Sequence, residues 1–153
     1  MVRAMQGKRR ILLVLLSVLI LMLGILLDRT LLLSSEDKFQ QETAALLKKY
    51  LDAGEFGEDY REGHMYFING KSGVSACYWA LKYGRAMSIE AYYALNHPSN
   101  ATSETIEVVL PNRQKFYFYP SVIIFHENNA AVLLSDKSGN AVYEHIQKMK
   151  QGN

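Results

Sequence analysis

The sequence predicts an α+β fold: an N-terminal transmembrane helix, then an amphipathic helix and an antiparallel β-meander of about five to six strands with a short C-terminal helix. Three observations predict this. Residues 11–27 form an apolar run without charge, residues 35–53 repeat apolar side chains at helical spacing, and beyond residue 63 apolar stretches alternate with turn residues. We therefore divide the chain into a cytoplasmic basic tail at 1–10, a transmembrane signal-anchor at 11–27 and an extracytoplasmic α+β domain at 28–153.

The apolar run sets the expected topology. As a helix it is about 25 Å long, slightly shorter than the roughly 30 Å hydrocarbon core of a bilayer. The cations that precede it, with no acid among them, are Arg3, Lys8, Arg9 and Arg10. Because positive charge is retained on the cytoplasmic side, we expect these residues to orient the protein with its domain in the periplasm or outside the cell. The membrane lipid bilayer is thus the first predicted partner.

A cleaved signal peptide is the alternative interpretation, because it also begins with a basic segment and an apolar stretch. Its apolar stretch is usually about 7–15 residues long and ends at a small-residue cleavage site. Here the run is longer, and the best candidate site is Leu33-Ser34-Ser35. The uncleaved anchor is favoured, and cleavage stays open.

The charge outside the tail argues against one class of partner. Of the 17 Lys and Arg residues, four lie in the tail, so 13 remain beside all 15 Asp and Glu, and 13 minus 15 gives −2. Affinity for nucleic acid comes mainly from Lys and Arg that neutralise phosphates. We therefore predict no nucleic-acid partner.

An amphipathic helix is expected from Ser35 to Ala53, with Ser34 or Ser35 as its cap and Gly54 as its stop. Its apolar stripe consists of Phe39, Thr43, Leu46, Leu47, Tyr50 and Leu51. The stripe fits both a continuation of the transmembrane helix and a separate helix packed on the sheet. Residues 54–63 follow as an acidic connector, which lacks the alternating ligands of a calcium loop and is expected to be a solvated loop.

Strands and turns are expected in the rest of the chain. The strands are His64 to Ile68, Val74 to Tyr83, Ala86 to Leu95, Thr105 to Leu110, Lys115 to His126 and Ala130 to Ser135. Turns are expected at Asn69-Gly70, Gly84-Arg85, Pro111 to Gln114, Asn128-Asn129 and Asp136 to Asn140, with a loop from Asn96 to Glu104 and a helix from Ala141 to Lys150. Pro120 marks an edge, a bulge or a strand end. Ser75–Tyr83 and Ser88–Asn96 fit two short helices as an alternative, although strands are favoured.

No catalytic residue, metal ligand or cofactor is predicted. The single cysteine, Cys77, excludes an intramolecular disulfide and is expected to be a buried small hydrophobe. Lys71-Ser72-Gly73, Lys137-Ser138-Gly139 and Ser35-Glu36-Asp37-Lys38 match short elements of penicillin-recognising enzymes, but expected turns explain both glycine triplets. The four histidines are scattered, and His126-Glu127 is the one pairing that invites inspection in the structure.

The aromatic side chains on the predicted strands are the feature that points to a binding surface. Alternation along Lys115 to Tyr119 predicts that Phe116 and Phe118 face the core while Tyr117 and Tyr119 face the other way. We predict a partner-binding surface formed by Tyr117, Tyr119, Tyr78 and Tyr92. Tyrosine suits interfaces because its ring buries area while its hydroxyl stays hydrogen-bonded. Tyrosine also suits any half-wet sheet face, and this simpler explanation has equal weight.

These features predict a single-pass, membrane-anchored accessory or binding protein, without enzymatic activity, whose exported domain engages a protein of the envelope or of a membrane complex. The order of basic tail, apolar helix, amphipathic continuation and antiparallel sheet also resembles pilins and pseudopilins. That resemblance implies, as the alternative, a subunit of a pilus or secretion assembly. In this chain Gly7 is followed by Lys8-Arg9-Arg10 rather than by the Phe-Thr-Leu of that family. A small enzyme or inhibitor-type immunity protein is the third hypothesis. Separately, Asn100-Ala101-Thr102 matches the Asn-x-Thr sequon for glycosylation.

Overall fold

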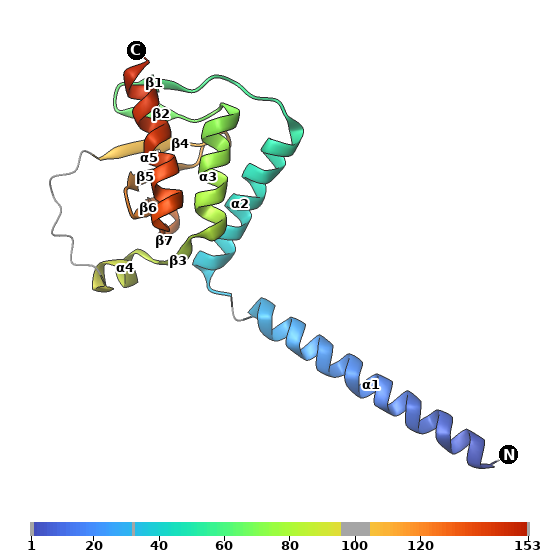
Figure 1. Ribbon diagram of the computed structural model, residues 1–153. Helices are drawn as coiled ribbons and strands as arrows, with labels where there is room; N and C mark the ends of the chain where they lie inside the picture. The colour runs from blue at the N-terminus through green and yellow to red at the C-terminus, as the bar shows by residue number, and fades with distance from the viewer. Residues whose placement is uncertain (1, 32, 96–104, 153) are drawn as a thin grey trace. The chain divides into compact units, whose positions relative to one another are not determined.

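The structure is a computed structural model that describes the backbone of residues 2–31, 33–95 and 105–152 (Figure 1). Side chains are described for residues 11–26, 33–95 and 105–152. The sequon at Asn100 and the predicted loop from Asn96 to Glu104 lie outside the described residues. The contacts between residues divide the chain into two units, Met1–Leu33 and Ser34–Asn153, and each is described by itself.

Helix α1 (Val2–Leu31) makes up the first unit. From Ile11 to Leu26 its large apolar side chains are each between 50 and 68% exposed. Within the described part of the chain, no helix combines the length and the hydropathy that a membrane span requires. The side chains of the predicted orienting residues Arg3, Lys8, Arg9 and Arg10 lie outside the described ones.

The second unit contains the remaining helices. They are α2 (Ser35–Ala53), α3 (Lys71–Tyr83), α4 (Ile89–Leu95), the 3₁₀ turn η1 (His126–Asn128) and α5 (Asp136–Gln151). Helix α2 has the predicted bounds: the Ser34 hydroxyl accepts a hydrogen bond from the N–H of Asp37, and Gly54 ends the helix with a φ of 71°. Such a left-handed end strongly favours glycine.

The strands of the second unit form one mixed sheet. They are β1 (Tyr60–Glu62), β2 (Met65–Phe67), β3 (Arg85–Ser88), β4 (Ile106–Val109), β5 (Lys115–Tyr119), β6 (Val122–Phe125) and β7 (Ala130–Leu133). Their order in the sheet is β1-β2-β4-β5-β6-β7-β3. Strands β4 to β7 form an antiparallel meander. The single strand expected from Lys115 to His126 was wrong, because the chain turns at Pro120 and Ser121 and forms the two strands β5 and β6. Strand β2 pairs in parallel with β4, so the expectation of a purely antiparallel sheet of five to six strands was wrong.

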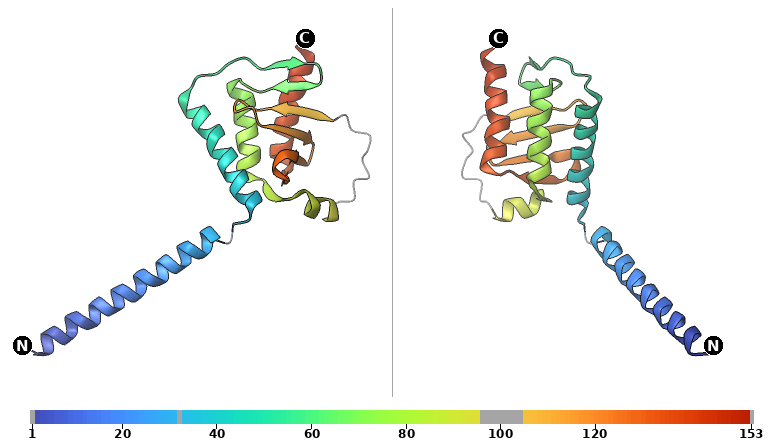
Figure 2. Two further views of the ribbon diagram at one scale, coloured as in Figure 1. Left: turned by 180° about the vertical axis from the view of Figure 1, so that it is seen from behind. Right: turned by 45° about the vertical axis from the view of Figure 1, so that its right-hand side comes forward.

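Helices α2, α3 and α5 lie together on one face of the sheet (Figure 2). The main core forms between them and that face, where Phe116 and Phe118 are 0 and 1% exposed. The opposite face carries a smaller cluster around Val122, Ile124 and Ala131. We call this the second sheet face. The partly buried side chains that pack on that cluster are Met87, Ile89, Tyr92, Tyr117, Tyr119 and Leu133.

Two expected strands proved partly or wholly helical. Residues 71–83 form α3, because Val74, Cys77, Tyr78 and Leu81 follow helical spacing and together bury one side of the helix. Of the stretch from Ala86 to Leu95, the residues up to Ser88 pair with β7 and the others form α4. The helical alternative was therefore the better interpretation of residues 75–83 and of most of 88–96.

Three expected turns or loops also differ. Asn69-Gly70 is not a hairpin turn, because Gly70 is the N-cap of α3. Tyr60–Glu62, inside the expected acidic loop, pairs with β2 as the edge strand β1. Asp136 to Asn140 is the first part of α5 rather than a turn, because the hydroxyl of Ser135 accepts a hydrogen bond from the N–H of Ser138 and caps the helix.

Candidate functional site

The second sheet face brings together three of the four predicted binding tyrosines. Tyr117 and Tyr119 alternate with the buried phenylalanines of β5, and α4 brings Tyr92 to the same cluster. Burial raises the pKa of Tyr92, and the neighbouring Tyr93 and Tyr119 raise it further. The hydroxyl of Tyr92 therefore stays protonated at neutral pH, as a hydrogen-bonding group at the edge of an apolar surface.

The ring of His126 packs edge-to-face on Tyr117, with 5.0 Å between the ring centroids. His126 and Glu127 both lie exposed on η1, at the end of β6. Among the described residues, no group of three His, Cys, Asp or Glu side chains is placed to hold a metal ion. His126 thus extends the aromatic surface of the second sheet face.

Tyr78 lies elsewhere. It is buried on α3, its ring contacts Trp79 at 5.0 Å, and the ammonium of Lys82 lies 5.5 Å from the ring centroid. Because α3 packs on the opposite face of the sheet, the structure does not bring Tyr78 together with Tyr92, Tyr117 and Tyr119.

A second cluster, which the sequence did not indicate, is centred on Asp59. Its Oδ1 accepts hydrogen bonds from the backbone N–H groups of Asn69 at 2.7 Å and Gly70 at 2.6 Å, at the N-terminus of α3. Its Oδ2 lies 2.7 Å from Nε2 of His145 on α5. The Asp59 and His145 side chains are only 15 and 16% exposed. One carboxylate therefore joins the segment before β1 to two helices.

The surroundings of Asp59 determine that its carboxyl group is ionised and that His145 donates the hydrogen bond between them. Burial raises the pKa of the Asp59 carboxyl, but hydrogen bonds from His145, Gly70 and Asn69, with the charge of His145, outweigh it and hold the pKa below the ordinary 3.8. An ionised carboxylate only accepts hydrogen bonds, so Nε2 of His145 is the donor. Burial, together with the nearby charge of Asp59, raises the pKa of Cys77 to about 12, so this thiol stays protonated.

A histidine held by a carboxylate is also the base-and-orienter part of a hydrolytic triad. Ser72, Ser75 and Ser138 line the groove beside His145, between α3 and α5. In the described part of the chain, however, no serine hydroxyl is hydrogen-bonded to His145. Moreover, a Cβ added at Gly73 would lie 2.6 Å from Nε2 of His145, so the ring packs tightly against α3. The geometry supports a structural clamp that caps α3 and attaches α5.

Asp59 and His145 are 86 residues apart, and neither carries a local sequence signal that joins them. The one available hint is the start of α3, where Gly70 offers no side-chain cap and thus leaves N–H groups for an acceptor from elsewhere. The free N–H groups can be inferred from the sequence only if residues 71–83 are predicted to be a helix, whereas the sequence favoured a strand there. No protein-family model matches the chain, and no curated protein or solved structure is significantly similar to it.

Proposed function

We propose that this protein is a single-pass, membrane-anchored accessory protein whose exported domain binds another component of the envelope or of a membrane complex. The second sheet face is the binding surface in this proposal, and Tyr117, Tyr119 and Tyr92 are its main contacts. No enzymatic activity is assigned, because the Asp59–His145 pair has a sufficient structural role.

The proposed anchor rests on the apolar sequence between Ile11 and Leu27. Among the described residues, no helix meets the requirements of a membrane span. Large apolar side chains from Ile11 to Leu26 are at least half exposed on every side of α1. A helix that is apolar all round needs burial in a protein core or in a membrane. Within the described residues, the core of the second unit contains none of these side chains.

The observation that carries the binding proposal is the composition of the second sheet face. The rings of Tyr117 and Tyr119 are only partly buried there, beside the fully buried Val122 and Ile124. Tyrosine is among the residue types that are enriched at protein interfaces and that contribute most of their binding energy. Among the described helices, the seven-residue α4 is the one that packs on this cluster. A partner can therefore bury further aromatic area there.

Topology provides the first test. A reporter that works only outside the cytoplasm, fused after Asn153 of the full-length protein, should be active. Changing Arg3, Lys8, Arg9 and Arg10 to Asn should lower that activity, because retained cations orient the span. A matched fusion with Lys48, Lys49, Lys71 and Lys82 changed to Asn removes the same charge from the domain and should retain activity. Activity of a cytoplasm-dependent reporter at the same position would contradict the proposal.

Binding is tested by photo-crosslinking in intact cells. Lys115 is exposed on β5, on the same side of the strand as Tyr117 and Tyr119, so a photoreactive residue there should give discrete adducts of higher mass. Changing Tyr117 and Tyr119 together to alanine should reduce adduct yield, since truncating interface anchors costs on the order of 2 kcal/mol, about thirtyfold in affinity. A probe at Tyr143, exposed on α5, is the control and should give no such adduct. Equal yields at both probes, or no effect of the tyrosine changes, would refute this surface.

The pilin-like alternative draws less support. The resemblance to pilins and pseudopilins implies an amphipathic helix that continues the apolar helix. In this chain, however, α1 ends at Leu31, and α2 begins at Ser35 with Ser34 as its own N-cap. We therefore retain the accessory protein as the proposed function.

A further inference from the structure

An exposed aromatic patch lies at one end of the second unit. Trp79 and Tyr83, one turn apart on α3, stack with 5.5 Å between ring centroids and 6° between planes, and are 44 and 66% exposed. The ammonium of Lys82 lies 5.1 Å from the Trp79 ring and 5.7 Å from that of Tyr83. Arg85 of β3 and, on α4, Tyr93 and Leu95 are exposed as well. We call these six residues the end patch.

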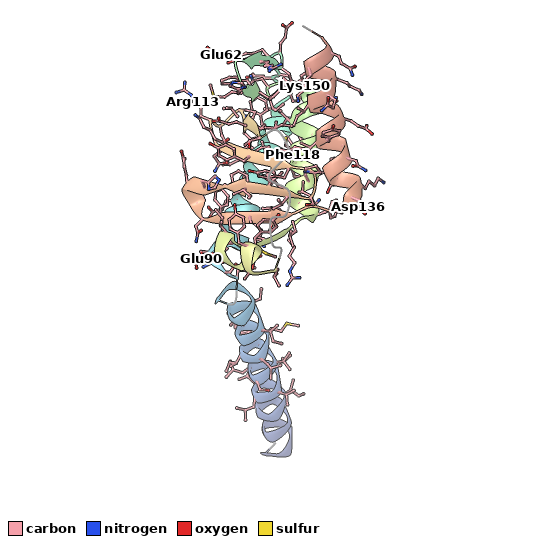
Figure 3. All side chains as sticks on the ribbon, turned by 90° about the vertical axis from the view of Figure 1, so that its left-hand side faces the viewer. Glu62, Glu90, Arg113, Phe118, Asp136 and Lys150 are labelled. Atoms are coloured by element: carbon pink, nitrogen blue, oxygen red, sulfur yellow. The ribbon has the colours of Figure 1, made fainter. Side chains whose placement is uncertain are left out.

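The end patch lies where the chain enters the second unit. The Gln40 side-chain amide, in the second turn of α2, donates hydrogen bonds to the carbonyls of Leu81 and Gly84, and Asp37 lines the same groove as Lys82. The start of α2 therefore lies beside the end of α3. In Figures 1 and 2, β3 and α4 continue along this end. Figure 3 places Glu90 of α4 at this end and Glu62 of β1 at the opposite one.

Chain length ties this end to the proposed membrane. Leu31, the end of α1, lies four positions beyond Leu27, the last residue of the apolar run, which corresponds to about 6 Å at the helical rise. Residues 32–34 add at most about 10 Å when extended. Ser34, the N-cap of α2, thus lies within roughly 16 Å of the end of the span, whatever the angle between the two units. The headgroup region itself extends about 5–7 Å beyond the hydrocarbon core.

We propose that the end patch is a membrane-contact surface, on which Trp79, Tyr83, Tyr93 and Leu95 insert into the lipid interface while Lys82 and Arg85 reach the headgroups. Trp and Tyr are enriched at this depth because their rings are apolar while their polar atoms stay hydrated. Lys and Arg stems lie along such apolar surface with their charges among the headgroups. This inference rests on the proposed membrane anchor. It would fix which end of the domain faces the bilayer and leave the second sheet face free for a protein.

The chain contains one tryptophan, so its fluorescence reports on Trp79 alone. The full-length protein is reconstituted into phosphatidylcholine vesicles with or without bromine on the acyl chains, and the vesicles are floated on a density gradient. We expect the protein to float, and the brominated lipid to remove most of the Trp79 emission. Changing Tyr83 and Lys82 to serine should weaken this quenching, because both side chains are exposed and hold the Trp79 ring at the surface.

The matched control moves the tryptophan to the opposite end. Tyr60 is 49% exposed on β1, so Trp79→Phe combined with Tyr60→Trp keeps one exposed tryptophan in the chain, and its emission should be unaffected by bromine. A protein that floats without quenching of Trp79, or with equal quenching in the control, overturns this inference while the anchor stands. A protein that does not float overturns the anchor and this inference together.

Discussion

Replacing Phe118 with alanine is expected to remove about 3–5 kcal/mol from the unfolding free energy of the domain Ser34–Asn153. Phe118 is 1% exposed and lies between Ile106 of β4 and Ile123 of β6 in the sheet register. Emptying such an aromatic site costs about 3–5 kcal/mol, out of the roughly 5–15 kcal/mol by which small domains are stable. Urea unfolding followed by circular dichroism measures this loss directly.

Tyr117→Ala is the matched control, because it truncates the adjacent aromatic residue on the opposite side of the same strand. Tyr117 is only partly buried and contacts His126, so we expect a loss nearer about 1 kcal/mol. Should Tyr117→Ala cost as much as Phe118→Ala, the second sheet face would be a second core. Its tyrosines would then be explained by folding alone, and the binding proposal would lose its main support.

Asp59→Ala is expected to cost about 3 kcal/mol. The change leaves His145 and the N–H groups of Asn69 and Gly70 without their acceptor in a largely buried place. Asp52→Ala is the control: its carboxylate pairs with Lys48 on an exposed helix surface, where such pairs contribute about 1 kcal/mol or less. If both variants lose the same unfolding free energy, the hydrogen bonds of Asp59 stabilise the domain no more than an exposed ion pair does.

The Asp59 clamp also predicts a pH dependence. The folded pKa of Asp59 lies below its ordinary value of 3.8, so its stabilisation is fully present above that value and is lost as pH falls through the folded pKa. The difference in unfolding free energy between the native protein and Asp59→Ala should therefore shrink as pH falls from about 5 toward about 2. A difference that persists undiminished to about pH 2 would contradict the assignment of Asp59 as an ionised acceptor.

The sequence predicted those features of the fold that depend on residues only a few positions apart. Helix α2 was predicted with its bounds because Ser34, the first-turn acids and Gly54 satisfy the helix ends within a few residues. The antiparallel pairings of β4 with β5 and of β6 with β7 were predicted because alternation and turn residues act over the same short range, but the division of Lys115 to His126 into β5 and β6 was not. The inward direction of Phe116 and Phe118 follows from the same alternation.

Residues 71–88 show where local patterns are insufficient. Short apolar stretches with small residues fit both helix and strand, so the choice depends on which partner buries them. Here residues 71–83 lie between α2 and α5 on one face of the sheet (Figure 2), while β7 pairs with residues 85–88. The parallel pairing of β2 with β4 likewise depends on a connection of nearly forty residues, which no turn signal encodes.

The sequence by itself thus determined the α+β class, the apolar N-terminal run, the bounds of α2 and the two-sided character of β5, because each depends on side chains within a few positions of one another. Only the tertiary structure decided that Tyr78 is separated from Tyr117 and Tyr119, that Asp59 meets His145, and that Trp79 and Tyr83 lie beside the start of α2. These contacts join residues from tens to more than eighty positions apart. Their free energy comes from burial and hydrogen bonding that exist only once the helices have packed on the sheet.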